Sequence, residues 1–311
     1  MRVFVTGATG FVTGAAVRLL LARGDAVTAL VRDPARAKSL GGAERVPGYL
    51  SDDAALRRGM SGADAVIHGA AMYEIGVSGA RRRAMFDANV RGTERVLSLA
   101  RDLGVPRIVH ISSIVVFGNT HGRVVDETYE RADTSYTSYY EETKLRAHEI
   151  AVRLAERGLP VVIVLPGQVY GPHDHSGYGD LLAMFARGWL PLVPMADLGL
   201  NMTFVDDIAR GILLALDRGQ PGRAYAMGGD IVRSRDVFNT LARVLGRRAP
   251  RLAVPYALLE AAALVRGDLR EAVSSSKGVT FWATDARART ELGYAPRSLE
   301  AGLRQTYARH G

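Results

Sequence analysis

Short apolar runs alternate with helical patterns along the chain, beginning with its first residues. Residues 3–6 are rich in β-branched and aromatic side chains, which is typical of a buried strand. Val17 and Leu20 then recur at helical spacing, and this pattern ends before Gly24, a residue type that commonly terminates helices. Residues 26–31 form a second apolar run. The order strand, helix, strand predicts a βαβ unit with two parallel strands.

The same alternation continues toward the C-terminus and predicts an α/β protein. Gly92 lies inside a long helical pattern and indicates close packing against a neighbour, because glycine in a helix costs about 1 kcal/mol relative to alanine. At 311 residues the chain is long for one core, so we expect one large domain with a smaller part appended. The pattern predicts a helix at residues 80–103 and further buried strands at 44–50, 65–71, 107–111, 160–165 and 201–205.

Two glycines, Gly7 and Gly10, lie in the turn between the first strand and the first helix. Glycine permits a sharp bend and lets the backbone approach a pyrophosphate without a Cβ atom in the way, with the helix N-terminus facing the phosphates. An ordinary tight turn would use the same residues, but the surrounding βαβ unit favours dinucleotide binding. The position of a third glycine, which would let helix and strand pack closely, holds Thr13, and Gly14 comes one residue late.

The end of the second strand bears on which dinucleotide binds. At this point an acidic residue would bind the ribose 2′-hydroxyl of NAD, whereas an arginine accommodates the 2′-phosphate of NADP. Arg32 therefore favours NADP(H), with Arg36 and Lys38 as further basic residues nearby. Asp33 keeps NAD open as the alternative cofactor.

Two later strands end in residues that suit a ligand site. Ala70 and Ala71 are small enough for the backbone to line a flat cofactor, although a tightly packed strand end needs the same residues. Ser112 and Ser113 follow the next strand, at the carboxyl edge where open α/β sheets bind ligands. A simple turn cap is the alternative explanation for this serine pair.

Tyr140 and Lys144 stand four residues apart, which places a phenol and an ammonium group on one face of a helix. This pair is the second chemical signal in the chain after the glycine turn. Tyr136 and Tyr139 have no lysine at the same spacing, and we interpret them as pocket or packing residues.

Composition excludes several kinds of site. The chain has no cysteine, so disulfides, thiolate metal ligands and a cysteine nucleophile are impossible. His173, Asp174 and His175 are adjacent residues without a distant partner, so we interpret their segment as a substrate lid and predict no metal. The net charge is +8, but the arginines are spread along helices beside acids, so we predict no nucleic-acid partner.

No apolar run approaches the roughly 18 residues that a membrane span requires, and the chain begins directly with a strand. We therefore expect a soluble, cytoplasmic protein with a small-molecule substrate and no membrane partner. Residues 252–265 are the most apolar of the later segments, and we interpret them as a core or pocket-lining helix.

Together, these segments resemble the extended short-chain dehydrogenase/reductases of the NAD(P)-dependent epimerase/dehydratase type. The resemblance runs from end to end and rests on residues 6–12, 89–93, 112–118, 140–144, 166–172, 204–209 and 291–294. Residues 199–207 are similar to the dihydroflavonol-reductase-like and hopanoid-associated sugar-epimerase-like branch. Besides Thr13, two positions depart from the family pattern: Tyr49 stands where an adenine-binding aspartate is frequent, and Leu165 where arginine is frequent.

By this resemblance the fold is a Rossmann-like, doubly wound parallel sheet with a smaller C-terminal substrate lobe. Residues 1–165 would form the dinucleotide-binding domain, which also receives about residues 200–217, and residues 166–311 would form mainly the substrate-binding lobe. We also expect a homodimer.

The resemblance further implies a Ser-Tyr-Lys mechanism. Tyr140 would exchange a proton with the substrate oxygen, Lys144 would hold the nicotinamide ribose and lower the tyrosine pKa, and Ser113 would hydrogen-bond the reacting oxygen. The cofactor, NADP(H) or alternatively NAD, would be bound by Gly7, Thr9, Gly10, Phe11, Val12, Arg32, Leu50, Ala70, Ala71, Asn89, Tyr140, Lys144, Pro166 and Val169.

Three functions compete at this point. The first is an oxidoreductase that transfers hydride between the cofactor and a carbonyl or alcohol of a small, largely apolar substrate. The second is a nucleotide-sugar epimerase or dehydratase that retains its cofactor, and it is disfavoured because no arginine stands near Asn201 to hold the diphosphate. The third is a non-catalytic binding protein, which the presence of Ser113, Tyr140 and Lys144 disfavours.

Overall fold

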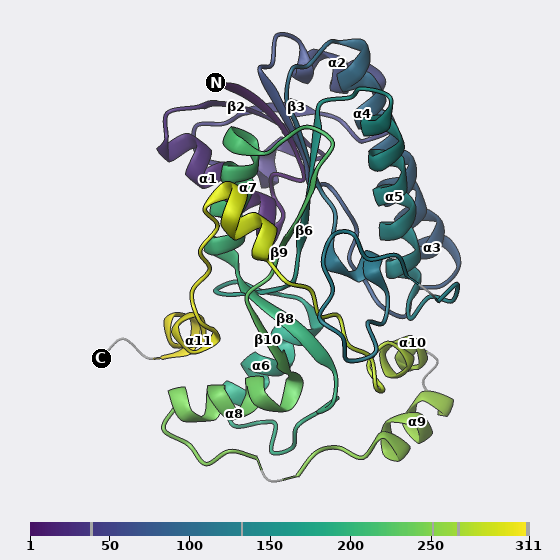
Figure 1. Cartoon of the computed structure of the whole chain (residues 1–311), viewed down its shortest axis with the longest axis vertical. Coiled ribbons are helices and arrows are strands. Elements are labelled where there is room, and N and C mark those ends of the chain that lie inside the picture. Colours follow the sequence, from purple (N-terminus) through teal and green to yellow (C-terminus); the bar gives the residue numbers. More distant parts are fainter. Residues whose placement is uncertain (38–39, 132, 251, 266–267, 309–311) are drawn as a thin grey trace.

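The computed structural model describes residues 1–37, 40–131, 133–250, 252–265 and 268–308. In these residues a large sheet of seven parallel strands runs in the order β3-β2-β1-β4-β5-β6-β9 (Figure 1). Its strands are β1 (Arg2–Thr6), β2 (Ala26–Val31), β3 (Glu44–Pro47), β4 (Ala65–His68), β5 (Ile108–Ile111), β6 (Val161–Pro166) and β9 (Ala224–Met227). The predicted doubly wound parallel sheet is confirmed. Its order reverses between β1 and β4, the point beside which such sheets bind ligands.

Helices cover both faces of this sheet, because successive side chains of a strand point to opposite sides. Val3 and Val5 of β1 pack in the cluster on one face, whereas Phe4 packs in the cluster on the other. The helices of the first face are α1 (Phe11–Ala22) and α7 (Val205–Arg218), and those of the second are α2 (Asp53–Met60), α4 (Gly92–Asp102) and α5 (Tyr139–Glu156) (Figure 1). Since both faces are covered, the strands are continuous apolar runs instead of alternating ones.

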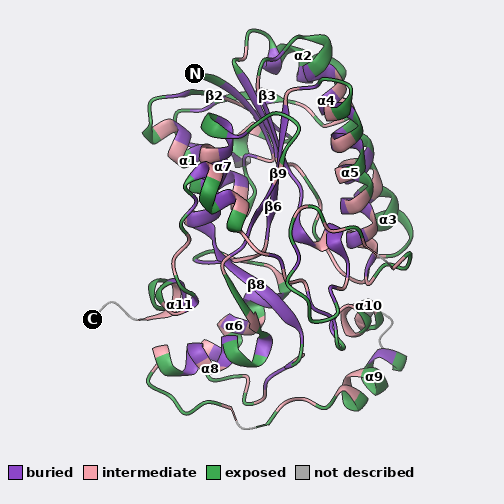
Figure 2. Ribbon diagram, viewed as in Figure 1, coloured by how far each residue is buried: buried purple, intermediate pink, exposed green. Residues whose placement is uncertain are grey.

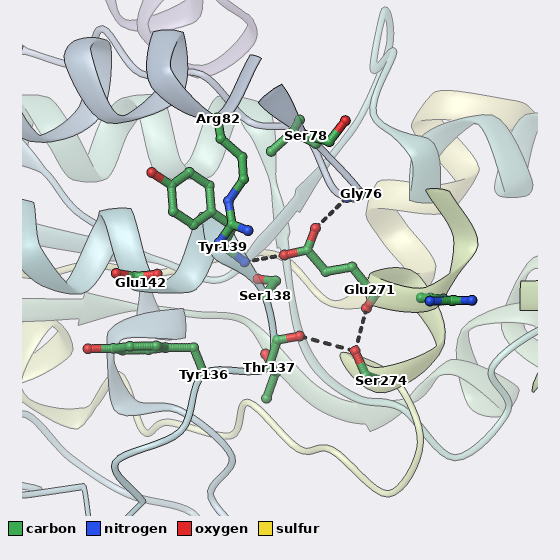
Figure 3. Close-up of a pocket in the computed structure, with 12 residues that line it drawn as sticks. Gly76, Ser78, Arg82, Tyr136, Thr137, Ser138, Tyr139, Glu142, Glu271 and Ser274 are labelled. Carbon is green, nitrogen blue, oxygen red and sulfur yellow. Dashed lines mark hydrogen bonds between the residues drawn. The ribbon is translucent and has the colours of Figure 1, made fainter. Parts of the chain in front are cut away.

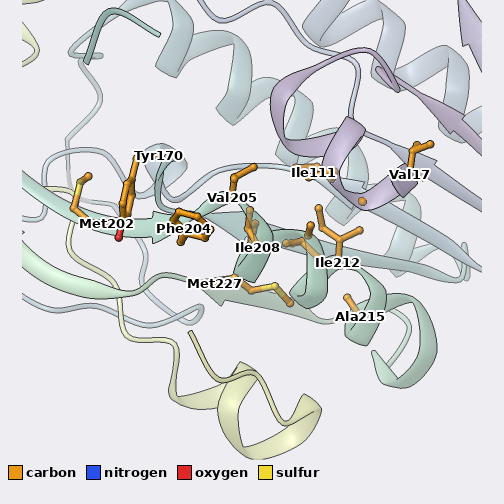
Figure 4. Close-up of a cluster of buried hydrophobic side chains, with 14 of the residues drawn as sticks. Val17, Ile111, Tyr170, Met202, Phe204, Val205, Ile208, Ile212, Ala215 and Met227 are labelled. Carbon is orange, nitrogen blue, oxygen red and sulfur yellow. The ribbon is translucent and has the colours of Figure 1, made fainter. Parts of the chain in front are cut away.

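A smaller sheet extends from the large one (Figure 1). In the described residues it has the order β10-β8-β7, with β7 (Gln168–Tyr170) parallel to β8 (Gly199–Phe204) and β10 (Asp230–Arg233) antiparallel to it. The helices around it are α6 (Gly177–Ala186), α8 (Ser234–Val244) and α11 (Leu299–Tyr307), and α9 (Tyr256–Val265) and α10 (Asp268–Ser274) lie further out (Figure 1). One apolar cluster extends from Val17 on α1, through Ile212 on α7, to Phe204 and Tyr170 of the small sheet (Figure 4). This shared core fixes the two sheets relative to each other.

The helix expected at residues 80–103 is divided into three parts. They are α3 (Gly79–Phe86), a π-helical turn η3 (Asp87–Arg91) and α4. A Cβ atom on Gly92 would lie 2.7 Å from Leu50 Cδ1, so the predicted close packing at this glycine is confirmed, and its neighbour is the segment after β3. The described residues also include the shorter helical turns η1 (Pro34–Arg36), η4 (Ile114–Phe117) and η5 (Ala288–Leu292).

The prediction of a core helix at residues 252–265 is wrong, whereas the alternative of a pocket-lining helix stays a prediction. In α9 only Ala263 is buried, whereas Leu264 and Val265 are 75% and 88% exposed (Figure 2). The physical reason is that α9 packs against α10 at the periphery and does not lie over either sheet (Figure 1). High apolar content predicted burial, but this helix has too few neighbours to bury its side chains.

The surface arginines stand beside acids, as their sequence pattern predicted. Within helices, Arg91 pairs with Asp87 and Arg146 with Glu142, each four residues apart. No helix in the described part of the chain is long and apolar enough to cross a membrane.

Candidate functional site

Ser113, Tyr140 and Lys144 come together at the carboxyl end of β5. Ser113 lies near enough to Tyr140 for its hydroxyl to lower the pKa of the phenol. Lys144 Nζ donates to the backbone oxygen of Ile111, the last residue of β5, at 2.9 Å. Ser113 is held by its own turn, where its Oγ accepts a hydrogen bond from Val115 N at 3.3 Å. The strand end therefore anchors both the serine and the lysine beside the tyrosine.

The start of α5 fixes Tyr140. Ser138 is the N-cap residue, and its Oγ accepts a hydrogen bond from the backbone N–H of Glu141 at 3.1 Å. The Glu141 side chain is buried, accepts from Thr137 N at 2.9 Å and pairs with Arg131 at 2.9 Å. Because these contacts define where the helix begins, they also set the direction in which its first turn presents Tyr140.

Burial determines the ionisation of this group of residues. It raises the pKa of Tyr140, the nearby Tyr73 phenol raises it further, and the Ser113 hydrogen bond lowers it. The Tyr73 ring meets the Tyr140 ring edge-on, with centroids 4.8 Å apart. Burial also lowers the pKa of Lys144 to about 8. Burial raises the pKa because loss of solvent disfavours the phenolate, and the lowering expected from Lys144 together with a bound oxidised nicotinamide stays a prediction.

Asn89 connects α5 to the chain after β4. Its Oδ1 accepts from Met72 N at 2.7 Å, and its Nδ2 donates to Met72 O and to Thr143 Oγ1, both at 3.0 Å. Thr143 Oγ1 in turn donates to the backbone oxygen of Tyr140 at 2.9 Å. Asn89 is 1% exposed and lies in the π-helical turn. The extra residue of that turn brings the amide inward to make these contacts.

The glycine turn has the geometry that its sequence indicated. Gly7 has φ +76°, and a Cβ atom there would lie 2.6 Å from the backbone nitrogen of Ala70 at the end of β4. Gly10 is the N-cap of α1, and no described side chain caps this helix. Thr9 and Gly10 are exposed, and Phe11 is half-buried. The free N–H groups at this helix end fit the phosphates of a dinucleotide.

The exchange of the third glycine for Thr13 is accommodated by a glycine elsewhere. A Cβ atom on Gly69 would lie 2.3 Å from Thr13 Oγ1 and 2.9 Å from Ile111 Cδ1. The room for the Thr13 side chain is thus provided by Gly69, which has no side chain of its own. The sequence analysis did not identify Gly69, although this residue interrupts the apolar run at 65–71 and could have signalled a close approach.

The two candidate determinants of cofactor type lie after β2. Arg32 is exposed at the end of the strand. Asp33 Oδ1 accepts a hydrogen bond from Ala35 N at 2.9 Å and thereby caps η1. Lys38 and the side chain of Arg36 lie outside the described part of the structure.

The remaining predicted cofactor residues lie near the carboxyl edge of the large sheet. Leu50 follows β3 and packs on Gly92, while its neighbour Tyr49 is 60% exposed. The other predicted residues are Ala70 and Ala71 after β4, Pro166 at the end of β6, and Val169 on β7. Parallel strands end at a common edge, which is why residues so far apart in sequence share it.

Three histidines that the sequence patterns did not single out lie behind the lysine: His68 and His110 are buried, and His148 is half-buried. His68 bonds Thr6 Oγ1 at 2.7 Å through Nδ1 and Thr93 Oγ1 at 3.0 Å through Nε2, and its ring stacks on that of His110 at 5.4 Å. His148 Nδ1 lies 3.2 Å from the Oγ of Ser112. Burial, followed by the charge of Lys144, lowers the pKa of His68 to about 3 and that of His148 to about 4. These histidines are therefore neutral at pH 7.

Two further histidines lie in the segment just before α6 and, unlike those behind Lys144, face solvent. His173 and His175 are exposed, and Asp174 Oδ1 accepts a hydrogen bond from Ser176 N at 2.8 Å just before α6. Among the described residues, no group of three or more histidine, cysteine, aspartate or glutamate side chains is placed to hold a metal ion.

A cavity of about 860 Å³ opens beside the start of α5 (Figure 3). Tyr136 and Tyr139 line it together with Arg82 and Glu271, which confirms the interpretation of both tyrosines as pocket residues. Its described lining includes none of the three residues of the Ser-Tyr-Lys group. The cavity therefore lies beside the candidate catalytic group and is not lined by it.

Comparisons with known proteins agree with this geometry. A model of the NAD-dependent epimerase/dehydratase family matches residues 3–228. The chain is 31% identical to sterol demethylase protein B of Methylococcus capsulatus, over 99% of this chain and 98% of that protein. It is 33% identical to a putative dihydroflavonol 4-reductase of Synechocystis, over 81% and 75% of the two chains. A dTDP-glucose 4,6-dehydratase double mutant from Streptomyces venezuelae, crystallised with NAD, superposes with a TM-score of 0.79 at 27% identity, over 99% of this chain and 96% of that one.

Proposed function

Because the chain belongs to the NAD-dependent epimerase/dehydratase family, we propose that it is an NADP(H)-dependent oxidoreductase that reduces the carbonyl, or oxidises the alcohol, of a small, largely apolar substrate. The observation that carries this proposal is the gathering of Ser113, Tyr140 and Lys144 at the end of β5, with Ser113 beside the Tyr140 phenol and Lys144 one helical turn away, bonded to Ile111 O. A nicotinamide cofactor supplies or accepts the hydride when it is bound.

The three side chains have separate roles in this proposal. Tyr140 donates its phenolic proton to the substrate oxygen as the carbonyl is reduced, and its raised pKa keeps that proton in place at neutral pH. Ser113 hydrogen-bonds the same oxygen and orients it toward the phenol. Lys144 presents an ammonium group to the ribose of the cofactor while the Ile111 carbonyl fixes its position.

The residues around the first helix support the cofactor assignment. The N-terminus of α1 has no acidic residue in its first turn and begins at Gly10, so it can accept the negative charge of a pyrophosphate. Arg32 is exposed where the 2′-substituent of the adenosine ribose would lie, which supports NADP(H). Asp33 already caps η1 with one of its oxygens, which disfavours the NAD alternative.

The assignment of an apolar substrate rests on the small sheet and on two relatives. Asn201, at the position near which an arginine would hold a sugar-nucleotide diphosphate, is 1% exposed and bonds both backbone groups of Ala283, at 2.6 and 3.1 Å. Both polar atoms of the Asn201 amide are thus used in hydrogen bonds within the protein. The two relatives reported above are named for a sterol, which is a fused hydrocarbon ring system, and for a dihydroflavonol, which carries two aromatic rings.

The second candidate is a nucleotide-sugar epimerase or dehydratase that retains its cofactor. The similarity to a dTDP-glucose 4,6-dehydratase favours it. Net cofactor turnover separates the two: a reductase consumes one NADPH for each carbonyl reduced, whereas an epimerase or dehydratase returns the hydride to its product.

The deciding experiment supplies purified protein with a panel of aldehydes, steroid and flavonoid ketones, and UDP-, GDP- and dTDP-sugars, once with NADPH and once with oxidised nicotinamide cofactor. The absorbance of reduced nicotinamide and the products are followed together. We expect stoichiometric NADPH loss with an apolar ketone. Conversion of a sugar nucleotide without NADPH loss would overturn the proposal in favour of the second candidate.

Several organisational features belong to the same proposal. We assign residues 1–165, with about 200–217, to the dinucleotide-binding domain and most of 166–311 to substrate binding. We also propose a cytoplasmic homodimer without nucleic-acid or membrane partners. The absence of cysteine from the sequence supports a fold that needs no oxidising compartment, and the paired arginines leave no single basic block for nucleic acid. Sedimentation equilibrium of the purified chain tests the dimer.

A further inference from the structure

A carboxylate from the C-terminal part of the chain reaches the start of the helix that carries Tyr140. Glu271 on α10 accepts the backbone N–H of Tyr139 through one oxygen and that of Gly76, at 2.5 Å, through the other (Figure 3). These donors lie 132 and 195 residues before it in the sequence. We propose that Glu271 is a positioning residue that sets the Tyr140 phenol for proton transfer, an inference that rests on the proposed function.

Each of the two amides lies close in sequence to one of the two tyrosines in the Tyr73–Tyr140 contact. Tyr139 directly precedes Tyr140, and Gly76 follows Tyr73 by three residues. The two tyrosine rings meet edge-on at 4.8 Å. One carboxylate therefore holds the backbone next to each tyrosine, at Gly76 and at Tyr139, and fixes how the two rings face each other.

The chemistry of this contact suits a carboxylate. Tyr139 is the first residue of α5, so its N–H has no partner within the helix, and negative charge is favourable at that helix end. Hydrogen bonds from backbone N–H groups to a carboxylate are stronger than those to a neutral acceptor. Both Glu271 oxygens are used, which makes the contact a two-point attachment.

Neighbouring contacts hold the same two segments together. Ser274, one turn further along α10, donates from Oγ to the backbone oxygen of Thr137 at 3.4 Å (Figure 3). Arg82 on α3 places its guanidinium carbon 3.9 Å from the centre of the Tyr139 ring. Thus α10 contacts the residues just before α5, and Arg82 of α3 covers the Tyr139 ring.

Glu271 acts through the backbone and not on the substrate. The cavity that it lines includes neither Ser113 nor Tyr140 in its described lining. A displacement of about 1 Å in a catalytic group costs about 100-fold in rate, so even a small shift of the helix start would be expressed in kcat. The attachment of α10 therefore controls the catalytic geometry from outside the site.

The first test measures the contact without any substrate. Hydrogen exchange at the backbone N–H groups of Gly76 and Tyr139 is followed by NMR in wild type, Glu271→Ala and Glu271→Gln. We expect exchange about 10-fold faster or more in Glu271→Ala and an intermediate value in Glu271→Gln, which keeps one carbonyl oxygen. The control is Glu260→Ala. Glu260 lies on the adjacent α9, and its exposed carboxylate pairs with Lys277. Wild-type exchange at both amides in Glu271→Ala would overturn the proposal.

The second test measures the consequence for catalysis. With a ketone that wild type reduces, we expect kcat of Glu271→Ala to fall about 10- to 100-fold while the dissociation constant of NADPH stays unchanged, and Glu271→Gln to recover part of kcat. Equal kcat in wild type and Glu271→Ala would overturn the positioning role. A wild type that reduces no carbonyl overturns the proposed function and the role in proton transfer, whereas the exchange data still decide whether Glu271 holds the two amides.

Discussion

The Tyr140 hydroxyl is the group on which the proposed chemistry depends at the scale of single residues. Tyr140→Phe keeps the ring and its edge-on contact with Tyr73 but removes the proton donor beside Ser113. General acids contribute about 10² to 10⁴ in rate, so we expect kcat to fall by that factor while NADPH affinity is retained. Initial rates and calorimetric titration measure both. The control Tyr136→Phe should leave kcat unchanged, and an active Tyr140→Phe would remove Tyr140 as the proton donor.

A second residue-scale prediction concerns the choice of cofactor. Arg32 is exposed at the end of β2, where a guanidinium can form charge-assisted hydrogen bonds to a 2′-phosphate. We expect wild type to prefer NADPH, and Arg32→Ala to lose about 1.5 to 3 kcal/mol for NADPH, roughly 10- to 150-fold in dissociation constant, with little change for NADH. Isothermal titration of both nucleotides provides the values. Equal losses for the two cofactors would assign Arg32 to the adenine instead.

At the scale of elements, α1 is held against the large sheet by the contact between Thr13 and Gly69. Gly69→Ala would place a Cβ atom 2.3 Å from Thr13 Oγ1, and overpacking of this kind costs about 1 to 3 kcal/mol in the free energy of unfolding. The added variant Thr13→Ala removes the clashing oxygen and should restore part of that loss. Urea unfolding of the single and double variants measures the coupling between the two sites.

Gly42→Ala provides the matched control for this experiment. Gly42 is exposed, and a Cβ atom there would have no neighbour within 4 Å among the described atoms. Its substitution should leave the free energy of unfolding nearly unchanged. If Gly69→Ala were as stable as Gly42→Ala, α1 would not be packed on the sheet as the structure has it.

The buried histidines determine how the whole molecule responds to acid. Burial lowers the folded-state pKa of His68 to about 3 and of His148 to about 4, from an ordinary value of 6.5, and lowers that of His110 in the same direction. The unfolded chain therefore binds protons that the folded chain excludes, and stability falls as pH decreases from 6.5 toward these values. We expect the melting temperature to decrease steadily across that range. A melting temperature independent of pH between 4 and 6.5 would contradict the burial of these rings.

His110→Leu tests the same point with one side chain. Both ring nitrogens of His110 are buried without a hydrogen-bond partner in the described structure, so an apolar side chain of similar size should be at least as stable at pH 7. We expect a smaller loss of melting temperature in acid than for wild type. The control His175→Leu replaces an exposed ring and should follow the wild-type curve.

The sequence by itself determined the local chemistry and the class of the fold. Short apolar runs and period-3.6 patterns depend only on neighbouring residues, so the βαβ units and the parallel sheet followed from them. The turn at Gly7 needs a left-handed backbone, which only the residue type at that position can supply. The spacing of Tyr140 and Lys144 is fixed by one helix. The family match over residues 3–228 agrees with these local signals.

Only the tertiary structure decided what depends on contacts between distant segments. It showed that Gly69 makes room for Thr13, that α9 lacks the neighbours needed to bury its apolar side chains, and that Glu271 reaches the start of α5. Burial, close approach and desolvation are set by the surrounding chain, often more than 50 residues away, as in the contact between residues 13 and 69. No local pattern in the sequence contains that information.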